Sequence, residues 1–246
     1  MSGHSKWSTI KHQKAITDKK RGNIFSKVAK VITVAVKEGG GGDPDINAKL
    51  RLAIEQAKSV NMPKDNIKRA IERGLGKGEG SNLQTVIYEG YGPEKTAVIV
   101  EAVTDNKNRT GAEIKTVFDR GGGGLGAPGS ALYLFSKKGL ILVEKSNDLE
   151  EQMLSLIDLG AEDVEDGESS IEVYTNPSEL DVVKNKITKA GFKLLQADII
   201  YKPNTLISIQ DPDKQNKLTS FLEKLEDLDD VQNVYCNLDF ILKDND

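Results

Sequence analysis

The sequence predicts an α+β fold, in which an N-terminal three-helix domain is followed by two ferredoxin-like α+β domains, one inserted in the other. Three observations support this fold class. Apolar residues recur at helical spacing between residues 24 and 71. From residue 84 onward, runs of alternating apolar residues take turns with further helical patterns. A glycine-rich linker at 74–80 separates the two regions.

The helical region contains three segments that each carry an apolar face. The first places Ile24, Val28 and Ala35 on one side and is expected to end at the glycine run 39–42. The third begins at Pro63, a favoured first position of a helix. We expect the three helices over about 24–38, 47–60 and 63–74, with residues 1–20 forming a basic arm or a loosely held helix.

A complete β-α-β-β-α-β order, which is that of a ferredoxin-like domain, fits within residues 139–201. Its strongest local signal is Asp166-Gly167 between two apolar-alternating runs, which predicts a hairpin. Asn176 and Pro177 are expected to start its second helix. The predicted elements are a strand at 139–145, a helix at about 149–157, a strand before 166, a strand at 171–175, a helix after 176 and a strand at 192–201.

The flanking segments supply a second copy of this pattern in two pieces. The helix of the first piece is expected to start at a capping box of Thr110 and Glu113, and the helix of the second at Asp211-Pro212. The expected elements are a strand at 96–104, a helix at 110–120 and a strand at 131–135, then a strand at 205–209, a helix and a strand at 231–240. The predicted domains are therefore residues 1–80, residues 81–136 plus 204–246, and residues 137–203. A single large mixed sheet over 84–240 is the alternative.

The N-terminal region is basic, whereas the rest of the chain is acidic. The whole chain has a net charge of −4, from 34 Lys+Arg and 38 Asp+Glu. Residues 1–80 hold 17 basic and 8 acidic residues, a net charge of +9, so residues 81–246 hold 17 and 30, a net charge of −13. This asymmetry predicts that the N-terminal region binds a polyanion, because a local basic patch is needed where an acidic body repels one. The alternative is a solvated, lysine-rich surface that binds nothing.

The predicted partner is nucleic acid, either DNA or ribosomal RNA, the latter on the ribosome. Lysine and arginine side chains neutralise phosphates, and Trp7 offers a face on which an unpaired base can stack. Trp7 could equally seat the arm on the helical core. No segment rich in Asn, Gln and Arg indicates base readout, so the residues leave DNA and structured RNA open, and they predict no oligomeric state. The candidate nucleic-acid-binding residues are Lys6, Trp7, Lys11, Lys14, Lys19, Lys20, Arg21, Lys64, Lys68, Arg69 and Arg73.

The sequence predicts neither an enzyme nor a bound cofactor or metal. Both histidines, His4 and His12, lie in the basic arm, so no Ser/His/Asp set or zinc motif can form in the body. The glycine patterns within 121–129 match a dinucleotide-binding spacing but follow a helix and precede a strand, the reverse of the required order. The single cysteine, Cys236, lies in an alternating segment that predicts a buried structural thiol. No apolar segment approaches membrane-spanning length and no secretory signal is recognised, which predicts a cytoplasmic protein.

Several long motifs occur in order along the chain: Gly3-His4-Ser5-Lys6-Trp7, Ile10-Lys11-His12, Lys19-Lys20-Arg21-Gly22, Asn61-Met62-Pro63-Lys64-Asp65-Asn66-Ile67, Ala70-Ile71, Tyr88-Glu89-Gly90-Tyr91-Gly92-Pro93 and Thr104-Asp105-Asn106-Lys107-Asn108-Arg109-Thr110. Together they resemble the YebC/PmpR family over essentially the whole chain. The resemblance implies a helical N-terminal domain followed by two α+β domains. Members are described as DNA-binding transcriptional regulators. Related members, among them a mitochondrial activator of cytochrome oxidase translation, are described as ribosome-associated factors that act at proline-rich stretches. The sequence departs from the family at 121–128, where an asparagine usually follows two glycines.

Overall fold

The computed structural model describes residues 18–77 and 82–239 of the chain. The chain is an α+β protein, as predicted, and it divides into two compact units. The major unit contains the described residues up to Ala131 together with Asn216–Val234. The minor unit contains Leu132–Gln215 and the described residues from Tyr235 onward. The finer division into three domains stays a prediction.

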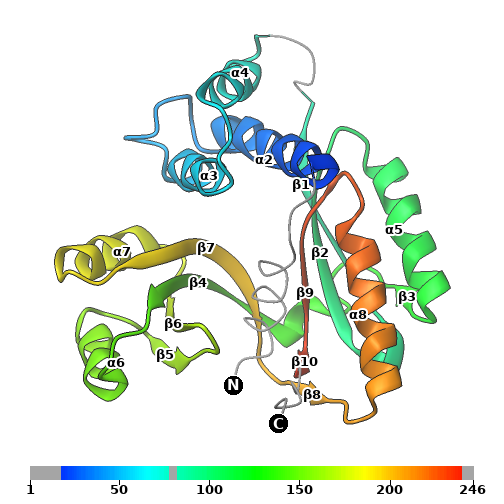
Figure 1. Cartoon of the computed structure of the whole chain (residues 1–246). Helices are drawn as coiled ribbons and strands as arrows, with labels where there is room; N and C mark the ends of the chain where they lie inside the picture. Colours follow the sequence, from blue (N-terminus) through cyan, green and yellow to red (C-terminus); the bar gives the residue numbers. More distant parts are fainter. Residues whose placement is uncertain (1–17, 78–81, 240–246) are drawn as a thin grey trace. The chain divides into compact units, whose positions relative to one another are not determined.

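Three helices form the N-terminal part of the major unit, as the apolar spacing predicts (Figure 1). They are α2 (Asp18–Glu38), α3 (Ala48–Ser59) and α4 (Lys64–Gly74). Their shared core contains Ile32, Leu50, Ala57 and Ala70, of which the first three are completely buried and Ala70 is 3% exposed. Helix α2 begins earlier than expected, so the last residues of the predicted arm belong to it.

Two residues explain how closely these helices pack. Asn47 caps α3 by accepting a hydrogen bond from the backbone N–H of Leu50, while its amide nitrogen donates to the carbonyls of Ala35 and Gly41. It therefore joins the end of α2 to the start of α3. Gly74 lies where α4 crosses α2, and a Cβ there would lie 2.8 Å from the carbonyl oxygen of Thr33. Only glycine fits this crossing.

The rest of the major unit is a four-stranded sheet covered by two helices. The strands are β1 (Gln84–Tyr91), β2 (Ala97–Thr104), β3 (Gly124–Leu125) and β9 (Val231–Cys236), in the order β3-β1-β2-β9. Helices α5 (Lys107–Gly121) and α8 (Pro212–Glu226) lie side by side (Figure 1), and the rings of Phe118 and Phe221 meet edge to face at 5.2 Å. The buried rings of these two phenylalanines join the helices into one layer.

The minor unit contains the complete ferredoxin-like pattern that the sequence predicts. Its elements are β4 (Phe135–Glu144), α6 (Leu149–Asp158), β5 (Asp163–Asp166), β6 (Ser170–Thr175), α7 (Leu180–Lys189) and β7 (Leu194–Pro203). The sheet order is β5-β6-β4-β7, with antiparallel pairing throughout. The predicted hairpin at Asp166-Gly167 is confirmed. The described residues form two separate four-stranded sheets, so the alternative of one large mixed sheet over 84–240 is wrong.

Several local predictions for the flanking pieces are wrong. The predicted strand at 131–135 is instead a short 3-10 helix, η2 (Leu132–Leu134), that leads into β4. The predicted strand at 205–209 shrinks to β8 (Ile207–Ser208), which pairs with β10 (Leu238–Asp239) outside both large sheets. The place beside β2 that such a strand would fill belongs to β1, because β1 and β2 follow each other in the chain and pair over eight residues. The predicted strand at 231–240 is likewise divided between β9 and β10.

Two helix starts also differ from expectation. Helix α5 is capped by Asn106, whose side chain accepts from the N–H of Arg109, so the predicted capping box at Thr110 is wrong. Helix α7 begins at Leu180 because Asn176 forms a local turn with Ser178 instead of capping the helix. By contrast, Asp211 does accept from the first turn of α8, as predicted.

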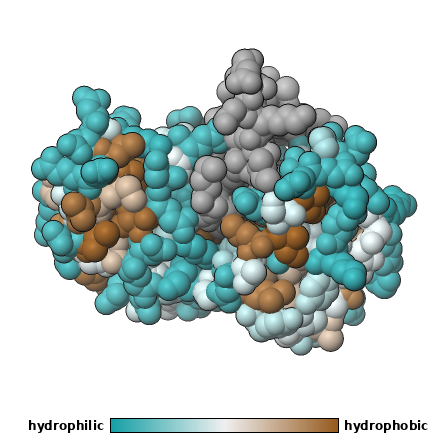
Figure 2. Space-filling model, turned by 90° about the horizontal axis from the view of Figure 1, so that it is seen from below, coloured by the Kyte–Doolittle hydropathy of each residue, from teal (hydrophilic) through white to brown (hydrophobic). Residues whose placement is uncertain are grey.

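Apolar side chains are distributed between the cores and small surface patches. Cys236 is 1% exposed, which confirms the predicted buried thiol. Hydrophilic residues surround the apolar patches on the face shown in Figure 2. The exposed large apolar side chains include Leu154 and Ile157 on α6. Among the described residues, no helix has both the length and the apolar character needed to cross a membrane.

Candidate nucleic-acid interface

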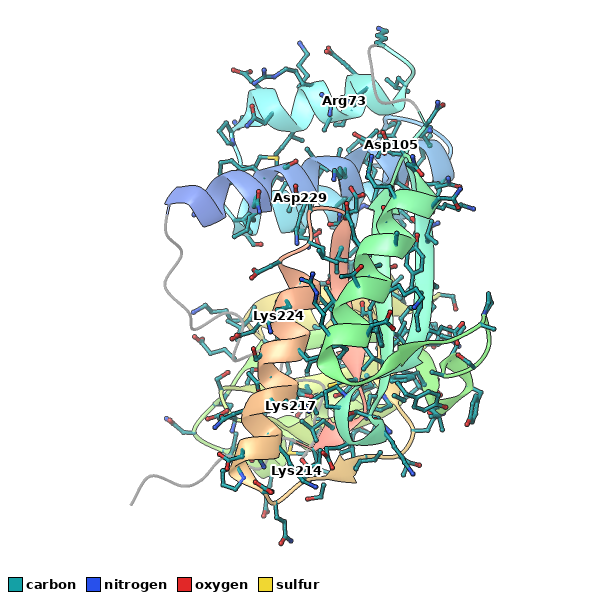
Figure 3. All side chains as sticks on the ribbon, turned by 90° about the vertical axis from the view of Figure 1, so that its right-hand side faces the viewer. Arg73, Asp105, Lys214, Lys217, Lys224 and Asp229 are labelled. Atoms are coloured by element: carbon teal, nitrogen blue, oxygen red, sulfur yellow. The ribbon has the colours of Figure 1, made fainter. Side chains whose placement is uncertain are left out.

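Helix α4 presents the described part of the predicted basic surface. Ile67 and Ala70 face the helical core, and the four predicted basic residues of α4 are exposed. At helical spacing they form two rows, one on each side of the outer face. The row members are Lys64 with Lys68 and Arg69 with Arg73. Figure 3 places Arg73 on this helix.

The four basic residues of α4 differ in what already binds them. Arg69 donates to the carbonyl of Asp65 and to the side chain of Asn66, so it is held against its own helix. The side chains of Lys64, Lys68 and Arg73 make no hydrogen bond or ion pair to any other described residue. These three side chains are therefore available for an outside anion.

Most other cations of the helical region already have acceptors within the chain. On α2, Lys30 forms an ion pair with Asp230, and Lys37 donates to the carbonyl of Leu83. Lys49 of α3 pairs with Glu38. Arg51 donates to the carbonyls of Pro44 and Asp45. Lys27 donates to the carbonyl of Glu226. Two cations absent from the predicted set, Lys58 and Lys77, are exposed and, like the three on α4, have no partner among the described residues.

The N-terminal part of the predicted interface cannot be placed beside α4. Lys6, Trp7, Lys11 and Lys14 lie outside the described residues. Lys19, Lys20 and Arg21 belong to the first turns of α2, and their side chains also lie outside the description. The assignment of these seven residues to nucleic-acid binding stays a prediction.

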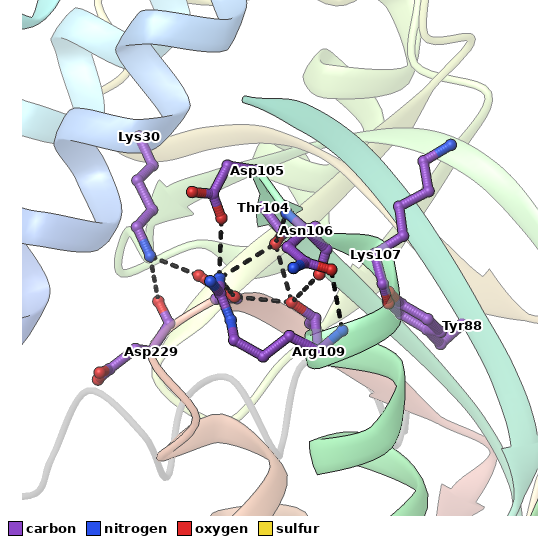
Figure 4. Close-up of polar contacts among 10 residues, drawn as sticks. Lys30, Tyr88, Thr104, Asp105, Asn106, Lys107, Arg109 and Asp229 are labelled. Atoms are coloured by element: carbon purple, nitrogen blue, oxygen red, sulfur yellow. Dashed lines mark hydrogen bonds and ion pairs between the residues drawn. The ribbon is translucent and has the colours of Figure 1, made fainter. Parts of the chain in front are cut away.

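A second polar cluster, which the sequence did not predict, lies between α2, α5 and β9 (Figure 4). Its centre is Asp230, whose side chain is only 8% exposed. One carboxylate oxygen lies 2.7 Å from Nζ of Lys30, and the other lies 2.7 Å from a guanidinium nitrogen of Arg109. The hydroxyl of Thr110 donates to the same oxygen at 2.7 Å. The cluster thus fastens the helical region to the sheet of the major unit.

The surroundings of Asp230 keep it ionised. Burial by itself would raise the pKa of this carboxyl, but hydrogen bonds from Lys30, Arg109 and Thr110 outweigh burial and hold the pKa well below its usual range. Arg109 is also paired with Asp105 at 2.9 Å. Both cations of the cluster are therefore already neutralised.

The hollow beside this cluster does not favour a phosphate. Its charged lining comprises Lys30, Arg109, Glu113, Asp227, Asp229 and Asp230, so acids outnumber cations two to one. An anion entering it would be repelled by the unpaired acids while competing for cations that are already bound. The hollow is therefore a poorer candidate than α4 for the predicted polyanion surface.

Sequence reasoning missed the cluster because its members are far apart in the chain. Lys30 and Asp230 are 200 residues apart, and nothing in local spacing connects them. The available signal was the motif Thr104–Thr110, which contains Arg109 and Thr110 and which the resemblance had already singled out. At the start of α5, Arg109 and Thr110 of this motif bind the carboxylate of Asp230.

Comparisons with known proteins agree over nearly the whole chain. Residues 5–77 match the model of the TACO1/YebC protein N-terminal domain, and residues 83–238 match that of the TACO1/YebC second and third domain. A probable transcriptional regulatory protein of Caldanaerobacter subterraneus is 51% identical over 241 residues, covering 97% of this chain and 98% of that protein. Another from Chloroflexus aurantiacus is 46% identical over 244 residues, covering 97% and 96%.

A solved structure shares the fold. The crystal structure of a conserved hypothetical protein from Aquifex aeolicus has a TM-score of 0.84 and 43% identity, and the match covers 96% of this chain and 99% of that one. The relatives' names describe regulators of transcription. Both parts of the chain match models of one family, and the identity holds over nearly the full length, so the chain belongs to the TACO1/YebC family.

Proposed function

We propose that this protein is a nucleic-acid-binding regulator of gene expression, acting on DNA as a transcriptional regulator and gripping the phosphate backbone through its helical N-terminal region. The observation that carries the proposal is the distribution of uncommitted cations. Lys64, Lys68 and Arg73 are exposed on one helix and have no partner among the described residues. Lys6, Lys11 and Lys14 add further positive charge before the start of α2 in the sequence.

The chemistry of α4 favours contact with phosphates over the reading of bases. Its uncommitted side chains are two lysines and one arginine, and its single amide side chain, Asn66, already accepts from Arg69. Base readout in the major groove depends on Asn, Gln and Arg at the groove-facing positions of a helix. We therefore expect weak discrimination between DNA sequences, below about tenfold, with an affinity that falls steeply with salt.

The test compares two charge-matched triple variants of the full chain. The first is Lys64→Gln, Lys68→Gln and Arg73→Gln. The second, the control, is Lys186→Gln, Lys189→Gln and Lys224→Gln, which removes three exposed cations of α7 and α8 whose side chains have no partner among the described residues. Each is titrated by fluorescence anisotropy with duplex DNA over a series of salt concentrations.

Loss of three phosphate contacts should make the negative slope of log K against log salt shallower by about 2.7, since each contact contributes about −0.9. The control should leave the slope unchanged. Equal slopes for both variants would remove α4 from the interface.

Competition by purified ribosomes, at physiological salt, then separates DNA from ribosomal RNA. The shape and charge of folded RNA can position a lysine-rich surface without any preferred base sequence. Binding to duplex DNA that ribosomes do not displace, with only weak preference among DNA sequences, would support transcriptional regulation. Tight capture by ribosomes, with no enriched DNA motif, would contradict direct transcriptional regulation and support the translation factor that the resemblance also implies.

A further inference from the structure

Strand β1 has an open edge over most of its length. Its other edge pairs with β2 from Gln84 to Tyr91. On the open side, the neighbouring strand β3 contributes only two residues, opposite Gly90 and Tyr91. Within the described part of the chain, no strand covers the edge from Gln84 to Ile87.

The hydrogen bonds around β1 show which of its backbone groups point outward. In an antiparallel pair, residues alternate between facing the partner strand and facing away from it. The N–H of Val103, which lies opposite Thr85, donates to Asp230 and therefore points away from β1. At the other end, the carbonyl of Glu89 accepts from Gly126, on the β3 side.

Both observations give the same alternation, so the odd-numbered residues of β1 point away from β2. The backbone N–H and C=O of Thr85 and Ile87 therefore face the open edge. No backbone partner among the described residues binds them there. Unpaired strand edges of this kind are templates for a further strand.

The chain itself prevents β3 from continuing along this edge. Pro128 has no N–H to donate, and Gly129 turns the chain with a φ of 85°. The carboxylate of Glu89, which is 5% exposed, then accepts the N–H groups of Gly129 and Ala131 at 2.7 and 2.9 Å. The loop is thus fastened back on Glu89, and the edge beyond it stays open.

A groove of about 510 Å³ lies along this same edge. One wall is β1, the second is the side of α5, and the end is closed by the loop after β3. On the α5 side the groove is shallow, because Gly111 and Ala112 have small side chains. Tyr88 lines the groove, and its hydroxyl donates to the carbonyl of Lys107. The residues lining the groove are Val86, Ile87, Tyr88, Glu89, Lys107, Asn108, Gly111, Ala112, Lys115, Leu125, Gly126 and Pro128.

The charges of the groove select the kind of chain that fits it. Its single acid, Glu89, is occupied by the loop, and Lys115 is paired with Asp119 at 2.6 Å. Lys107 is exposed and has no partner for its ammonium group among the described residues. Alternating backbone donors and acceptors match a peptide and not a nucleic acid, while the uncommitted lysine favours an acidic side chain.

We propose that the open edge of β1 is a docking site for an extended acidic peptide segment of a partner protein, which adds to the sheet as a strand next to β3. Added strands of this type take their affinity from backbone hydrogen bonds and their specificity from alternate side chains. Here alternate side chains of the peptide enter the groove beside α5, where Lys107 binds an acidic one. The proposal does not depend on nucleic-acid binding by α4.

The probe for this site is a displayed library of random short peptides, selected on the full-length protein and counter-selected on an Ile87→Pro variant. Proline at this position removes an N–H that faces outward and leaves the pairing with β2 intact. Enriched peptides should show acidic residues and an alternating apolar pattern. Their binding is then measured by fluorescence polarisation.

Two readouts distinguish an added strand from other modes of binding. Methylation of every second backbone nitrogen of the peptide should abolish binding when the methylated nitrogens face β1, and should leave binding unchanged when they face away from it. This test uses the unaltered protein, so it remains valid even if Ile87→Pro fails to fold. Lys107→Glu should weaken binding by about tenfold, while Lys224→Glu, a control on α8, should have no effect.

Three results would overturn the proposal. The first is a library that yields no peptide dependent on the edge. The second is a set of enriched peptides whose apolar residues have helical spacing, and whose affinity does not depend on which backbone nitrogens are methylated or on the charge of residue 107. The third is sedimentation showing a dimer of this chain that Ile87→Pro dissociates, because the edge would then be occupied by a second copy.

Discussion

Asp230 is predicted to be the residue whose loss most loosens the helical region from the sheet of the major unit. Its carboxylate is buried and accepts from Lys30, Arg109 and Thr110, all at 2.7 Å. Replacing it with alanine removes the counterion of Lys30, whose side chain is 20% exposed, and leaves the buried hydroxyl of Thr110 only Thr104 and Asn106 as partners. Removing the counterion of a partly buried charge and one hydrogen bond of a buried hydroxyl lowers the free energy of unfolding.

The expected magnitude follows from the exposure of each partner. Arg109 is 47% exposed and keeps its ion pair with Asp105, so it contributes little. Loss of the charged bond to Lys30 costs about 1.5 to 3 kcal/mol, and loss of the bond from Thr110 adds about 1 kcal/mol. We expect Asp230→Ala to lower the free energy of unfolding by about 3 kcal/mol, and Asp230→Asn, which keeps the volume and can still accept, by about 1 to 2 kcal/mol.

The neighbouring residue provides a matched control. Lys30 also bonds to Asp229, but to its backbone carbonyl at 3.0 Å, and the Asp229 side chain is exposed. Asp229→Ala should therefore change stability by less than about 0.5 kcal/mol. Urea titration followed by far-UV circular dichroism measures all three variants.

The pH dependence gives a second readout for Asp230. Its pKa is lower in the folded chain than in the unfolded chain, so the stability it contributes is present above its ordinary pKa of about 3.9 and is lost as the pH falls below that value. The gap between wild type and Asp230→Asn should therefore narrow at acidic pH. Equal stability of Asp230→Ala and Asp229→Ala at neutral pH would refute the reasoning.

Three further predictions concern other parts of the chain. Asn47→Ala should lower the free energy of unfolding by about 2 to 3 kcal/mol, because it removes the cap of α3 and the two hydrogen bonds that the amide donates to Ala35 and Gly41. Asn47→Asp should also destabilise, because it keeps the cap but turns a buried carboxylate oxygen toward those two carbonyls; chemical denaturation measures both. Burial raises the pKa of Glu172 to about 7, so stability should fall as the pH rises from about 4.3 to about 7, and Glu172→Gln should abolish that fall in thermal melts. Brief proteolysis should cut within 74–80 rather than in the glycine run 39–42, where Gly41 is bonded to Val36 and Asn47, and early cutting inside 139–201 would contradict the inserted domain.

Local sequence signals predicted the elements whose hydrogen bonds and apolar faces are themselves local. Asn47 before an apolar-periodic segment marks the start of α3, and Asp166-Gly167 marks the turn between β5 and β6. The capping box at Thr110 failed because a threonine three residues before a glutamate has the same pattern whether it caps a helix or faces a buried carboxylate. Only the fold, which brings Asp230 to Thr110, decides between the two.

Strand pairing was harder to predict than strand position. The segment 205–209 has the apolar composition of a strand, and a symmetrical copy of the ferredoxin-like pattern needs one there. The preceding hairpin of β1 and β2 takes the place beside β2 instead, since adjacent strands joined by a tight turn pair at low entropic cost. No strand was expected over 84–91, so this competitor for the place beside β2 was missed.

The candidate basic surface was predictable in composition but not in availability. Net charge counts Lys30 and Lys64 equally, yet the structure gives them different roles. Lys30 is bound by a buried acid, so a phosphate that reached it would have to displace a partly buried ion pair that salt screens weakly. Lys64 is exposed, and its charge is open to solvent, salt and ligand alike. The lysines of α2 that bind residues 226–230 therefore hold the helical region in place, and the described cations whose side chains have no partner are Lys58, Lys77 and the three on α4. An excess of positive charge in a sequence thus overstates the binding surface wherever an acidic segment of the same chain, here Glu226–Asp230, already occupies part of it.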